Sequence, residues 1–208
     1  MTTQGKLTVT TFLTLDGVMQ APGAPHEDPS GGFRHGGWLV PYVDDDMLRI
    51  VADAFSRADA FLLGRKTYDI FAAHWPRVPD QDDPVASALN RLPKYVASRT
   101  MEKAEWRGTT VIRDVAKEVA ELKRRYPGEV QVHGSGDLAQ TLMEHNLVNE
   151  YRLWLYPVVL GGGKRLFGSG AVPAALTLAG TTTTSTGVVV STYRRAGKPS
   201  YGSFGLDQ

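Results

Sequence analysis

The residues with the clearest chemical potential form a glycine turn, GSGDLA at residues 134–139, which follows the strand-like run VQVH. Glycines allow a backbone to approach a phosphate closely, and unpaired N–H groups at the start of the following helix can donate to it. Taken alone, the turn is equally compatible with a tight connection that binds nothing. It nevertheless indicates a candidate phosphate site, made of Gly134, Ser135, Gly136, Asp137 and Leu138.

Two other predicted strand ends carry polar and basic residues. In LLGRKTYDIF, two cations stand in the first turn of a helix, where the positive end of the helix dipole disfavours them unless an anion lies nearby. In YVASRT, a second such cluster follows another strand. Ligands of open α/β sheets lie outside the carboxyl ends of the strands, so one long polyanion could contact all three ends; solvated surface cations are the alternative. The candidates here are Gly64, Arg65, Lys66, Thr67, Ser98, Arg99 and Thr100.

Acidic and aromatic residues supply further candidates. The run Asp44-Asp45-Asp46 opens a predicted helix, so Asp44 is expected to cap it and the carboxylates of Asp45 and Asp46 can pair with the helix dipole. Candidates for substrate contact are Asp16, Trp38 and Tyr156, with a turn residue and core aromatics as the alternative reading. The five histidines show no i, i+4 pair and there is no cysteine, so no metal site is expected.

The elements that must position these residues alternate between strands and helices. The pattern predicts an α/β fold with a mostly parallel sheet and an antiparallel hairpin at its C-terminal end. A long loop, residues 16–38, carries six glycines and three prolines without any regular period. The domain is expected to span residues 1–197, followed by a flexible tail, 198–208. We expect strands at 6–15, 59–64, 94–98, 109–112, 130–133, 150–159, 176–184 and 187–195, and helices at 44–58, 65–75, 84–92, 114–126 and after residue 135.

Composition excludes several classes of function. The chain has 208 residues, 42% of them hydrophobic and 22% charged, which is enough for one well-buried core. A formal charge of +1 provides no overall field to attract nucleic acid or an anionic membrane. The absence of cysteine excludes disulfides and thiol chemistry. No stretch approaches the roughly 20 apolar residues of a spanning helix, and the start MTTQGKL lacks a signal peptide, so we expect a cytoplasmic protein.

The order of motifs resembles the dihydrofolate reductase superfamily. The motifs are TFLTLDGVMQ, LLGRKTYDIF, YVASR, VHGSGDLAQTL and YRLWLYPVVLGGGKRLF, and together they span roughly residues 6–196. The chain is more similar to the stand-alone branch that looks like the reductase domain of the bifunctional deaminase-reductase of riboflavin biosynthesis. This resemblance implies a three-layer α/β/α sandwich around a mixed, mainly parallel sheet, NADPH as cofactor, and a homodimer.

Roles for individual residues follow from the resemblance. It places Gly64, Arg65 and Thr67 around the ribose 2′-phosphate and the pyrophosphate, and Ser98 and Arg99 at the adenosine. The turn at 134–138 would hold the pyrophosphate. Folate-reducing members carry an acidic residue near the start of the first helix, and the resemblance makes Asp45 and Asp46 the candidate catalytic acids. The long insertion before 44–46 departs from the pattern of those members, so the resemblance does not name dihydrofolate as the substrate.

The expected activity is hydride transfer from NADPH to a C=N or C=O of a small heterocycle, pterin-like or ribosylaminopyrimidine-like. One alternative is the 5-amino-6-(5-phosphoribosylamino)uracil reductase of riboflavin biosynthesis, for which Lys164 or Arg165 could hold a substrate phosphate. Another is a non-catalytic NADPH-binding module. The apolar strand YRLWLYPVVL suggests the homodimer interface. Residues 20–38 are expected to form a mobile lid, or else a passive insertion.

Overall fold

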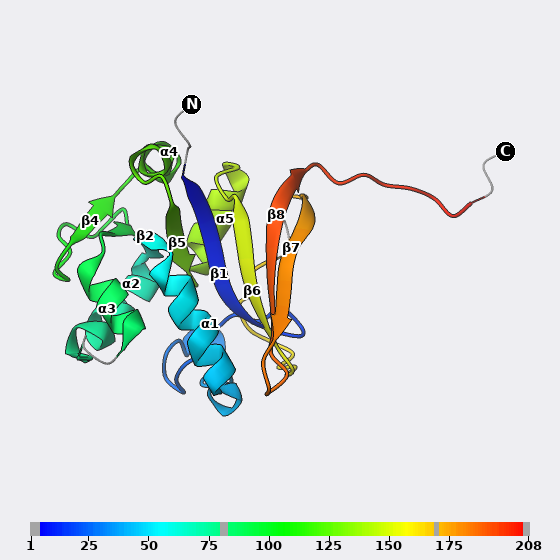
Figure 1. Ribbon diagram of the computed structural model, residues 1–208, viewed down its shortest axis with the longest axis horizontal. Coiled ribbons are helices and arrows are strands. Elements are labelled where there is room, and N and C mark those ends of the chain that lie inside the picture. Colours follow the sequence, from blue (N-terminus) through cyan, green and yellow to red (C-terminus); the bar gives the residue numbers. More distant parts are fainter. Residues whose placement is uncertain (1–4, 80–82, 169–170, 206–208) are drawn as a thin grey trace.

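The computed structural model describes residues 5–79, 83–168 and 171–205, and its centre is an eight-stranded sheet (Figure 1). The order across the sheet is β4-β3-β2-β5-β1-β6-β8-β7. The six strands from β4 to β6 are parallel, while β8 runs antiparallel to β6 and β7 antiparallel to β8. The strands are β1 Lys6–Thr14, β2 Ala58–Gly64, β3 Lys94–Ala97, β4 Thr109–Ile112, β5 Glu129–His133, β6 Glu150–Tyr156, β7 Ala175–Thr183 and β8 Val189–Gly197.

Five α-helices of the described residues cover the sheet, and three of them begin at an aspartate that caps the first turn. Asp44 accepts a hydrogen bond from the N–H of Met47 at 2.7 Å, and Asp83 and Asp114 cap their helices in the same way. The starts of α2 and α5 have no side-chain cap. The helices are α1 Asp45–Ser56, α2 Arg65–His74, α3 Pro84–Arg91, α4 Val115–Arg125 and α5 Gly136–Glu144, with 3-10 turns at Ser30–Gly32, Val40–Tyr42 and Trp75–Arg77.

The helices form two layers, one on each face of the sheet, as in the predicted three-layer α/β/α sandwich. In Figure 1, α1 lies in front of the sheet and α5 behind it. Buried residues of α4 and α5 pack with one face of the central strands in a common core. Buried residues of α1, α2 and α3 pack together on the opposite face. The predicted fold class is therefore confirmed.

The centre of the rear face of the sheet is apolar where β1 pairs with β5. Leu7 and Val9 of β1 alternate with threonines, and they pair in register with Val130 and Val132 of β5. All four are 0% exposed and belong to one cluster with the inner sides of α4 and α5. Burying such side chains stabilises the fold by roughly 1.5–3 kcal/mol each.

Observed element ends agree with the predicted ones to within a few residues. The largest difference is in β6, which ends at Tyr156 rather than at residue 159. Pro157 follows, and proline has no N–H to continue a strand ladder. β8 runs two residues further than expected, to Gly197, because its pairing with β7 continues there.

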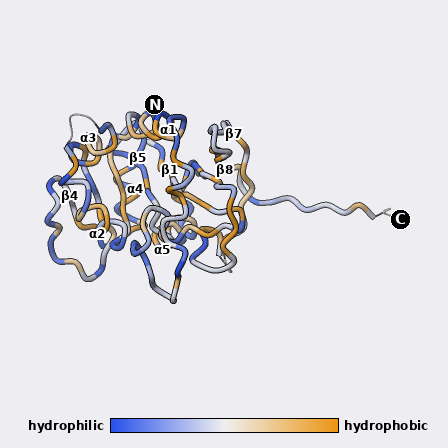
Figure 2. Tube along the Cα trace, turned by 90° about the horizontal axis from the view of Figure 1, so that it is seen from below, coloured by the Kyte–Doolittle hydropathy of each residue, from blue (hydrophilic) through white to orange (hydrophobic). Residues whose placement is uncertain are grey.

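After β8 the chain leaves the body of the molecule. Residues 198–205 are without helix or strand and are mostly exposed. Figures 1 and 2 show the segment projecting from the sheet in two perpendicular views. The domain boundary near residue 197 and the flexibility of this tail stay predictions.

Candidate functional site

The carboxyl ends of β2 and β5 meet through the hydroxyl of Ser135. This hydroxyl accepts a hydrogen bond from the N–H of Gly64 at 2.8 Å and lies 2.9 Å from the hydroxyl of Thr67 and 3.1 Å from the carbonyl of His133. Gly64 ends β2 and Thr67 lies in the first turn of α2. Two of the predicted sites, 71 residues apart in the chain, are therefore in direct contact.

The backbone around this contact requires small residues. Gly134 has φ of +55° and Ser135 has φ of +61°, both in the left-handed region that favours glycine. A side chain at Gly64 would place its Cβ 3.0 Å from the Cβ of Ser135, closer than normal packing allows. The glycines at 64 and 134 thus let two strand ends and two helix starts come together.

The starts of α2 and α5 at this contact can both bind an anion. Neither helix has a side-chain cap, so their first-turn N–H groups have no side-chain acceptor. Each helix also presents the positive end of its dipole there. The donors and the small residues suit a phosphate or pyrophosphate group, so the chain fits the phosphate portion of a dinucleotide.

The cations of α2 have carboxylate partners within the chain. Arg65 forms an ion pair with Asp69 one turn later, at 2.8 Å, and Lys66 lies 2.9 Å from Asp28. The side chains of Arg65, Asp69 and Lys66 are about half exposed or more, whereas that of Asp28 is 12% exposed. An exposed pair contributes only about 0–1 kcal/mol, so a phosphate can replace Asp69 beside Arg65. The anions that offset the dipole are thus Asp69 and Asp28 in this structure.

The third predicted strand end lies at the same sheet edge, because Ala97 at the end of β3 pairs with Gly64. The hydroxyl of Ser98 accepts from the N–H of Met101 at 3.1 Å and shapes its own loop. Arg99 and Thr100 are exposed beside it. The structure brings this cluster to the edge that also carries the glycine turn, and in the described residues no hydrogen bond or ion pair joins the two.

The loop at 20–38 is held by residues that sequence reasoning missed. Gln20 is 5% exposed, and its amide donates to the carbonyls of Asp28 and Ser30 and accepts from the N–H of Lys164. The carboxylate of Asp28 lies 2.6 Å from the ammonium of Lys164 and also contacts Lys66. Burial opposes ionisation of Asp28, but hydrogen bonds from Lys164, Ser30 and Lys66 hold its pKa well below the usual range.

The acidic run at 44–46 joins α1 to the β7–β8 turn. Asp44 caps α1, as predicted, and its other oxygen accepts from Ser185 and Thr186. Asp46 accepts from Arg49 and from the N–H of Ser185. The hydrogen bond from Arg49 is the main reason why the pKa of Asp46 is lowered. Asp45 is exposed.

The three candidates for substrate contact fall into two places. Trp38 and Tyr156 touch edge to face at 5.2 Å, and they are 7% and 0% exposed within an aromatic cluster that also includes Trp154. Asp16 closes the turn after β1 by accepting from Thr14, from Leu160 and from the N–H of Gly161. The hydrogen bond from Thr14 is the main cause that lowers the pKa of Asp16 to about 2.

The sheet forks beside the glycine turn. β1 pairs with β5 only as far as Thr10, opposite His133, whereas it pairs with β6 as far as Thr14. Among the described residues, the last four residues of β1 therefore have no strand partner on the β5 side. His133, the residue before Gly134, stands at this fork and is 7% exposed.

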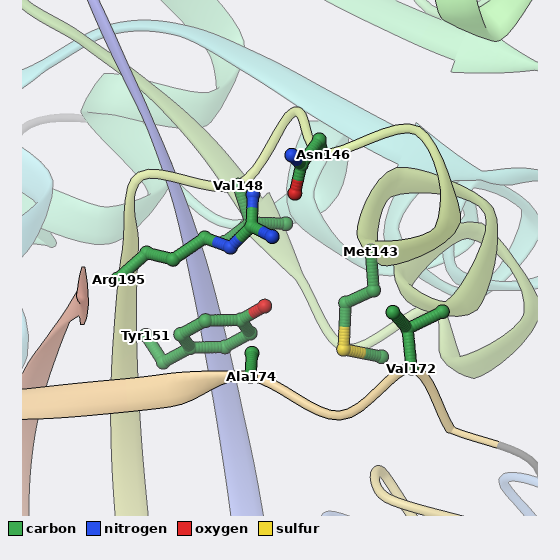
Figure 3. A pocket seen from close by; sticks show the side chains of 7 residues that line it. All are labelled: Met143, Asn146, Val148, Tyr151, Val172, Ala174 and Arg195. Atoms are coloured by element: carbon green, nitrogen blue, oxygen red, sulfur yellow. The ribbon is translucent and has the colours of Figure 1, made fainter. Parts of the chain in front are cut away.

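A small pocket lies at the opposite edge of the sheet (Figure 3). It is formed where α5 ends, β6 begins and β7 begins, so it is separate from the carboxyl ends of the parallel strands. None of the predicted site residues lines it. In the described ranges, no three potential metal ligands gather and no helix is long and apolar enough to span a membrane. The pocket is lined by Met143, Asn146, Val148, Tyr151, Val172, Ala174 and Arg195.

Comparisons with known proteins agree with this architecture. The uncharacterized protein YyaP of Bacillus subtilis (strain 168) is 28% identical over 192 residues, which is 91% of this chain and 95% of YyaP. A putative riboflavin biosynthesis protein from Shewanella sp. PV-4 has a similar structure, with a TM-score of 0.68 and 21% identity over 91% of this chain and 98% of that one.

Dihydrofolate reductase from Enterococcus faecalis, solved in a complex with NADP(H), has the same fold. Its TM-score is 0.59 at 14% identity, over 93% of this chain and 98% of that one. At such identities, the likeness to solved structures shows the fold. The family model described as the RibD C-terminal domain matches residues 5–190. The chain therefore belongs to the RibD C-terminal domain family and has a dihydrofolate-reductase-like fold.

Proposed function

We propose that the protein is an NADPH-dependent reductase that transfers a hydride to a C=N or C=O of a small heterocycle, pterin-like or ribosylaminopyrimidine-like. Membership of the RibD C-terminal domain family supports an oxidoreductase of the riboflavin-pathway type. The observation that carries the proposal is the meeting of two uncapped helix starts at the Ser135 contact, beside the fork between β1 and β5.

The chain's own residues would bind and orient the dinucleotide. The first-turn N–H groups of α2 and α5, with Gly134 and Gly136, would hold the pyrophosphate. Arg65, with Lys66 and Thr67, would hold the ribose 2′-phosphate, and the loop at 98–100 would lie at the adenosine. When bound, the nicotinamide supplies the hydride. The protein's contribution is to fix the distance and orientation between the two reacting rings.

The source of the proton is a separate part of the proposal. Asp45 and Asp46 were predicted as catalytic acids. Asp46 is ionised and engaged by Arg49 and Ser185, an arrangement that suits holding α1 in place better than releasing a proton. We propose Asp45 or an ordered water as the donor. Asp45→Asn should lower turnover more than Asp46→Asn if the carboxyl is the donor, and it should leave turnover unchanged if water is.

Calorimetry with NADPH and NADH tests the cofactor. Wild type should bind NADPH more tightly, and Arg65→Ala should lose about 1.5–3 kcal/mol of binding free energy for NADPH while its affinity for NADH changes little. Arg57→Ala is a matched control, because Arg57 forms an equally exposed ion pair with Asp53 at the end of α1. Equal affinities of wild type for the two dinucleotides would contradict the proposal.

The phosphorylated ribosylaminopyrimidine of riboflavin biosynthesis is a second candidate substrate. Lys164 favours this substrate. Its ammonium lies 2.6 Å from the carboxylate of Asp28 and could bind a substrate phosphate in place of that carboxylate. Screening NADPH oxidation against pterins, pyrimidines, flavins and quinones separates the candidates. A protein that binds NADPH but oxidises it with none of these would favour the non-catalytic module.

Two further expectations stay predictions. The dimer was suggested by the strand at 150–159, but Trp154 and Tyr156 are core residues that are 1% and 0% exposed, so they do not form its interface. Light scattering should give twice the mass of one 22.7 kDa chain if the dimer forms through another surface.

The lid at 20–38 would have to break the contacts of Asp28 with Lys66 and Lys164 in order to open. Shortening residues 22–36 should then reduce turnover while NADPH binding survives.

A further inference from the structure

A line of buried polar side chains crosses the α1 face of the sheet, and the proposed phosphate contacts do not use it. Glu129, Gln131 and His133 alternate along β5 and are 2%, 0% and 7% exposed. Arg152 of β6 is 5% exposed and lies 3.1 Å from Glu129. Buried polar groups are costly unless they are paired, so an arrangement of this extent calls for a physical explanation.

The contacts of Gln131 fix the orientation of its amide and the direction of its hydrogen bond with His133. Its amide nitrogen lies 2.7 Å from the carbonyl of Ala54 in α1 and 2.8 Å from a carboxylate oxygen of Glu129. Both of these neighbours can only accept, so the amide nitrogen must face them. The amide oxygen of Gln131 consequently faces the Nε2 of His133, at 3.1 Å. Since that oxygen can only accept, Nε2 of His133 must carry the proton.

The imidazole of His133 is neutral. Burial, with a smaller contribution from Arg152, lowers its pKa to about 3. A neutral imidazole has one N–H, which the contact with Gln131 places on Nε2, so Nδ1 presents a lone pair. Within the described part of the chain, no group donates a hydrogen bond to Nδ1. Nδ1 is not one of the fully buried, unpartnered side-chain atoms of the described residues, so it keeps some access to solvent. A ligand N–H placed there would replace water and would be bound in preference to a group that cannot donate.

The position of His133 makes such a ligand available. It is the last residue of β5, directly before Gly134, and it pairs with Thr10 at the fork between β1 and β5. Its ring packs against Phe55 of α1 at 4.7 Å and against Phe61 at 5.7 Å, which fixes its plane. Val132, the preceding residue, is 0% exposed, whereas His133 retains a small exposed surface.

We propose that Nδ1 of His133 recognises an N–H group of the ligand bound at this strand end, and that Gln131 is the positioning residue that holds the required tautomer. This inference rests on the proposed function, because the ligand class comes from it. The N–H belongs either to the carboxamide of the nicotinamide or to the ring of the heterocyclic substrate. A ligand that presents a carbonyl or a methyl group at the same point should be rejected, since the acceptor would remain unpaired.

Nitrogen NMR on protein with ¹⁵N-labelled histidine tests the tautomer without any ligand. The signal of His133, assigned from its absence in His133→Asn, should report a neutral ring protonated on Nε2 between pH 8 and pH 5. In Gln131→Leu, this single tautomer should be replaced by a mixture or by the form protonated on Nδ1. A wild-type ring that is protonated on Nδ1, or charged at pH 6, would overturn the inference.

Binding of NADPH and of its 3-acetylpyridine analogue identifies the donor. The analogue replaces the carboxamide NH₂ with a methyl group and is otherwise the same. If the carboxamide is the donor, wild type should prefer NADPH over the analogue by roughly 5–100-fold, and His133→Leu should lose the preference. His133→Asn should restore part of it, because the oxygen of asparagine can occupy the position of Nδ1.

If the substrate is the donor, wild type and His133→Leu should bind NADPH equally, and the variant should raise KM for the substrate with a smaller change in kcat. Melting curves of each variant verify that it is folded. NADPH affinity and substrate KM that are both unchanged in folded His133→Leu would overturn the inference alone. Wild type that binds neither dinucleotide would instead overturn the proposed function, and this inference with it.

Discussion

The two faces of the central sheet are built on different principles. Behind the sheet, Leu7, Val9, Val130 and Val132 pack against α4 and α5 with no polar atom among them. In front, their neighbours along the same strands are Thr8, Thr10, Glu129, Gln131 and His133, which lie beneath α1 together with Arg152. Both faces are buried, so the difference is not one between core and surface.

The comparison separates stability from recognition. An apolar face is stabilised by burial that depends little on direction, and it tolerates changes of shape. A polar face has to satisfy each donor and acceptor, so it fixes orientations and leaves a defined group at its end. Here that group is His133, at the edge where the glycine turn begins. The front face therefore extends from the core to the strand ends of the proposed binding site.

The largest expected effect comes from breaking the buried pair on the front face. Arg152→Met removes one of the two cations beside the buried carboxylate of Glu129, and Lys6 remains as the other, so it should lower the free energy of unfolding by up to about 3–5 kcal/mol. The control is Arg194→Met. Arg194 pairs with Glu150 on β6, but its side chain is 68% exposed, so the loss should stay below about 1 kcal/mol. Urea unfolding measures both, and equal losses would contradict the comparison.

A cavity on the rear face should have a similar or slightly smaller effect. Leu7→Ala should lower the free energy of unfolding by about 2–5 kcal/mol, since Leu7 is 0% exposed and packed against apolar neighbours. Leu178→Ala, at a side chain of β7 that is 51% exposed, should change stability by less than about 0.5 kcal/mol. Urea unfolding tests both variants, and a small loss of stability in Leu7→Ala would show that the rear face is not the main source of stability.

The front face should also respond to pH. Below pH 6.5 the unfolded chain protonates His133, whereas burial keeps the folded ring neutral down to about pH 3. The unfolded state therefore binds more protons, and stability falls as the pH decreases from 6.5 towards 4.5, by up to about 1.4 kcal/mol per pH unit. His133→Leu should reduce this slope. His145→Gln, at an exposed histidine, is the control; parallel curves for wild type and His133→Leu would refute the expectation.

The smallest expected effect comes from a core substitution that should not destabilise the protein. The hydroxyl of Thr8 is buried and has no hydrogen-bond partner among the described residues, so Thr8→Val should leave stability unchanged or raise it by up to about 1 kcal/mol. The same exchange in reverse on the rear face, Val9→Thr, should cost about 1–3 kcal/mol, because it buries a new hydroxyl among apolar side chains. Thermal unfolding of the two variants decides, and a clear loss in Thr8→Val would indicate a hidden partner of that hydroxyl.

The fold was predictable from the sequence because periodicity is a local signal. Alternation and capping residues identified the elements, and Asp44 was correctly expected to cap α1. The three polar clusters at strand ends were likewise found from strand order alone. The rest of the site depends on contacts across long separations, such as Asp28 with Lys164, 136 residues apart, for which no local pattern exists.

The polar front face was missed for a different reason. EVQVH at 129–133 alternates between polar and apolar residues, a pattern that normally indicates one solvated face. The useful signal was that neighbouring strands, LTVT at 7–10 and EYRLW at 150–154, alternate in the same way although helices are predicted on both sides of the sheet. Polar residues on a covered face need partners, and that requirement could have drawn attention to His133.

Ser135 also affects how the molecule moves. It occupies the left-handed region, at a cost of about 1–3 kcal/mol that glycine would avoid. In return, its hydroxyl joins the end of β2, the first turn of α2 and the start of α5. We expect this link to couple the two helices mechanically, so that a displacement at the start of one is transmitted to the other. The proposed dinucleotide, bridging both starts, would then meet one rigid body rather than two independently fluctuating helix ends.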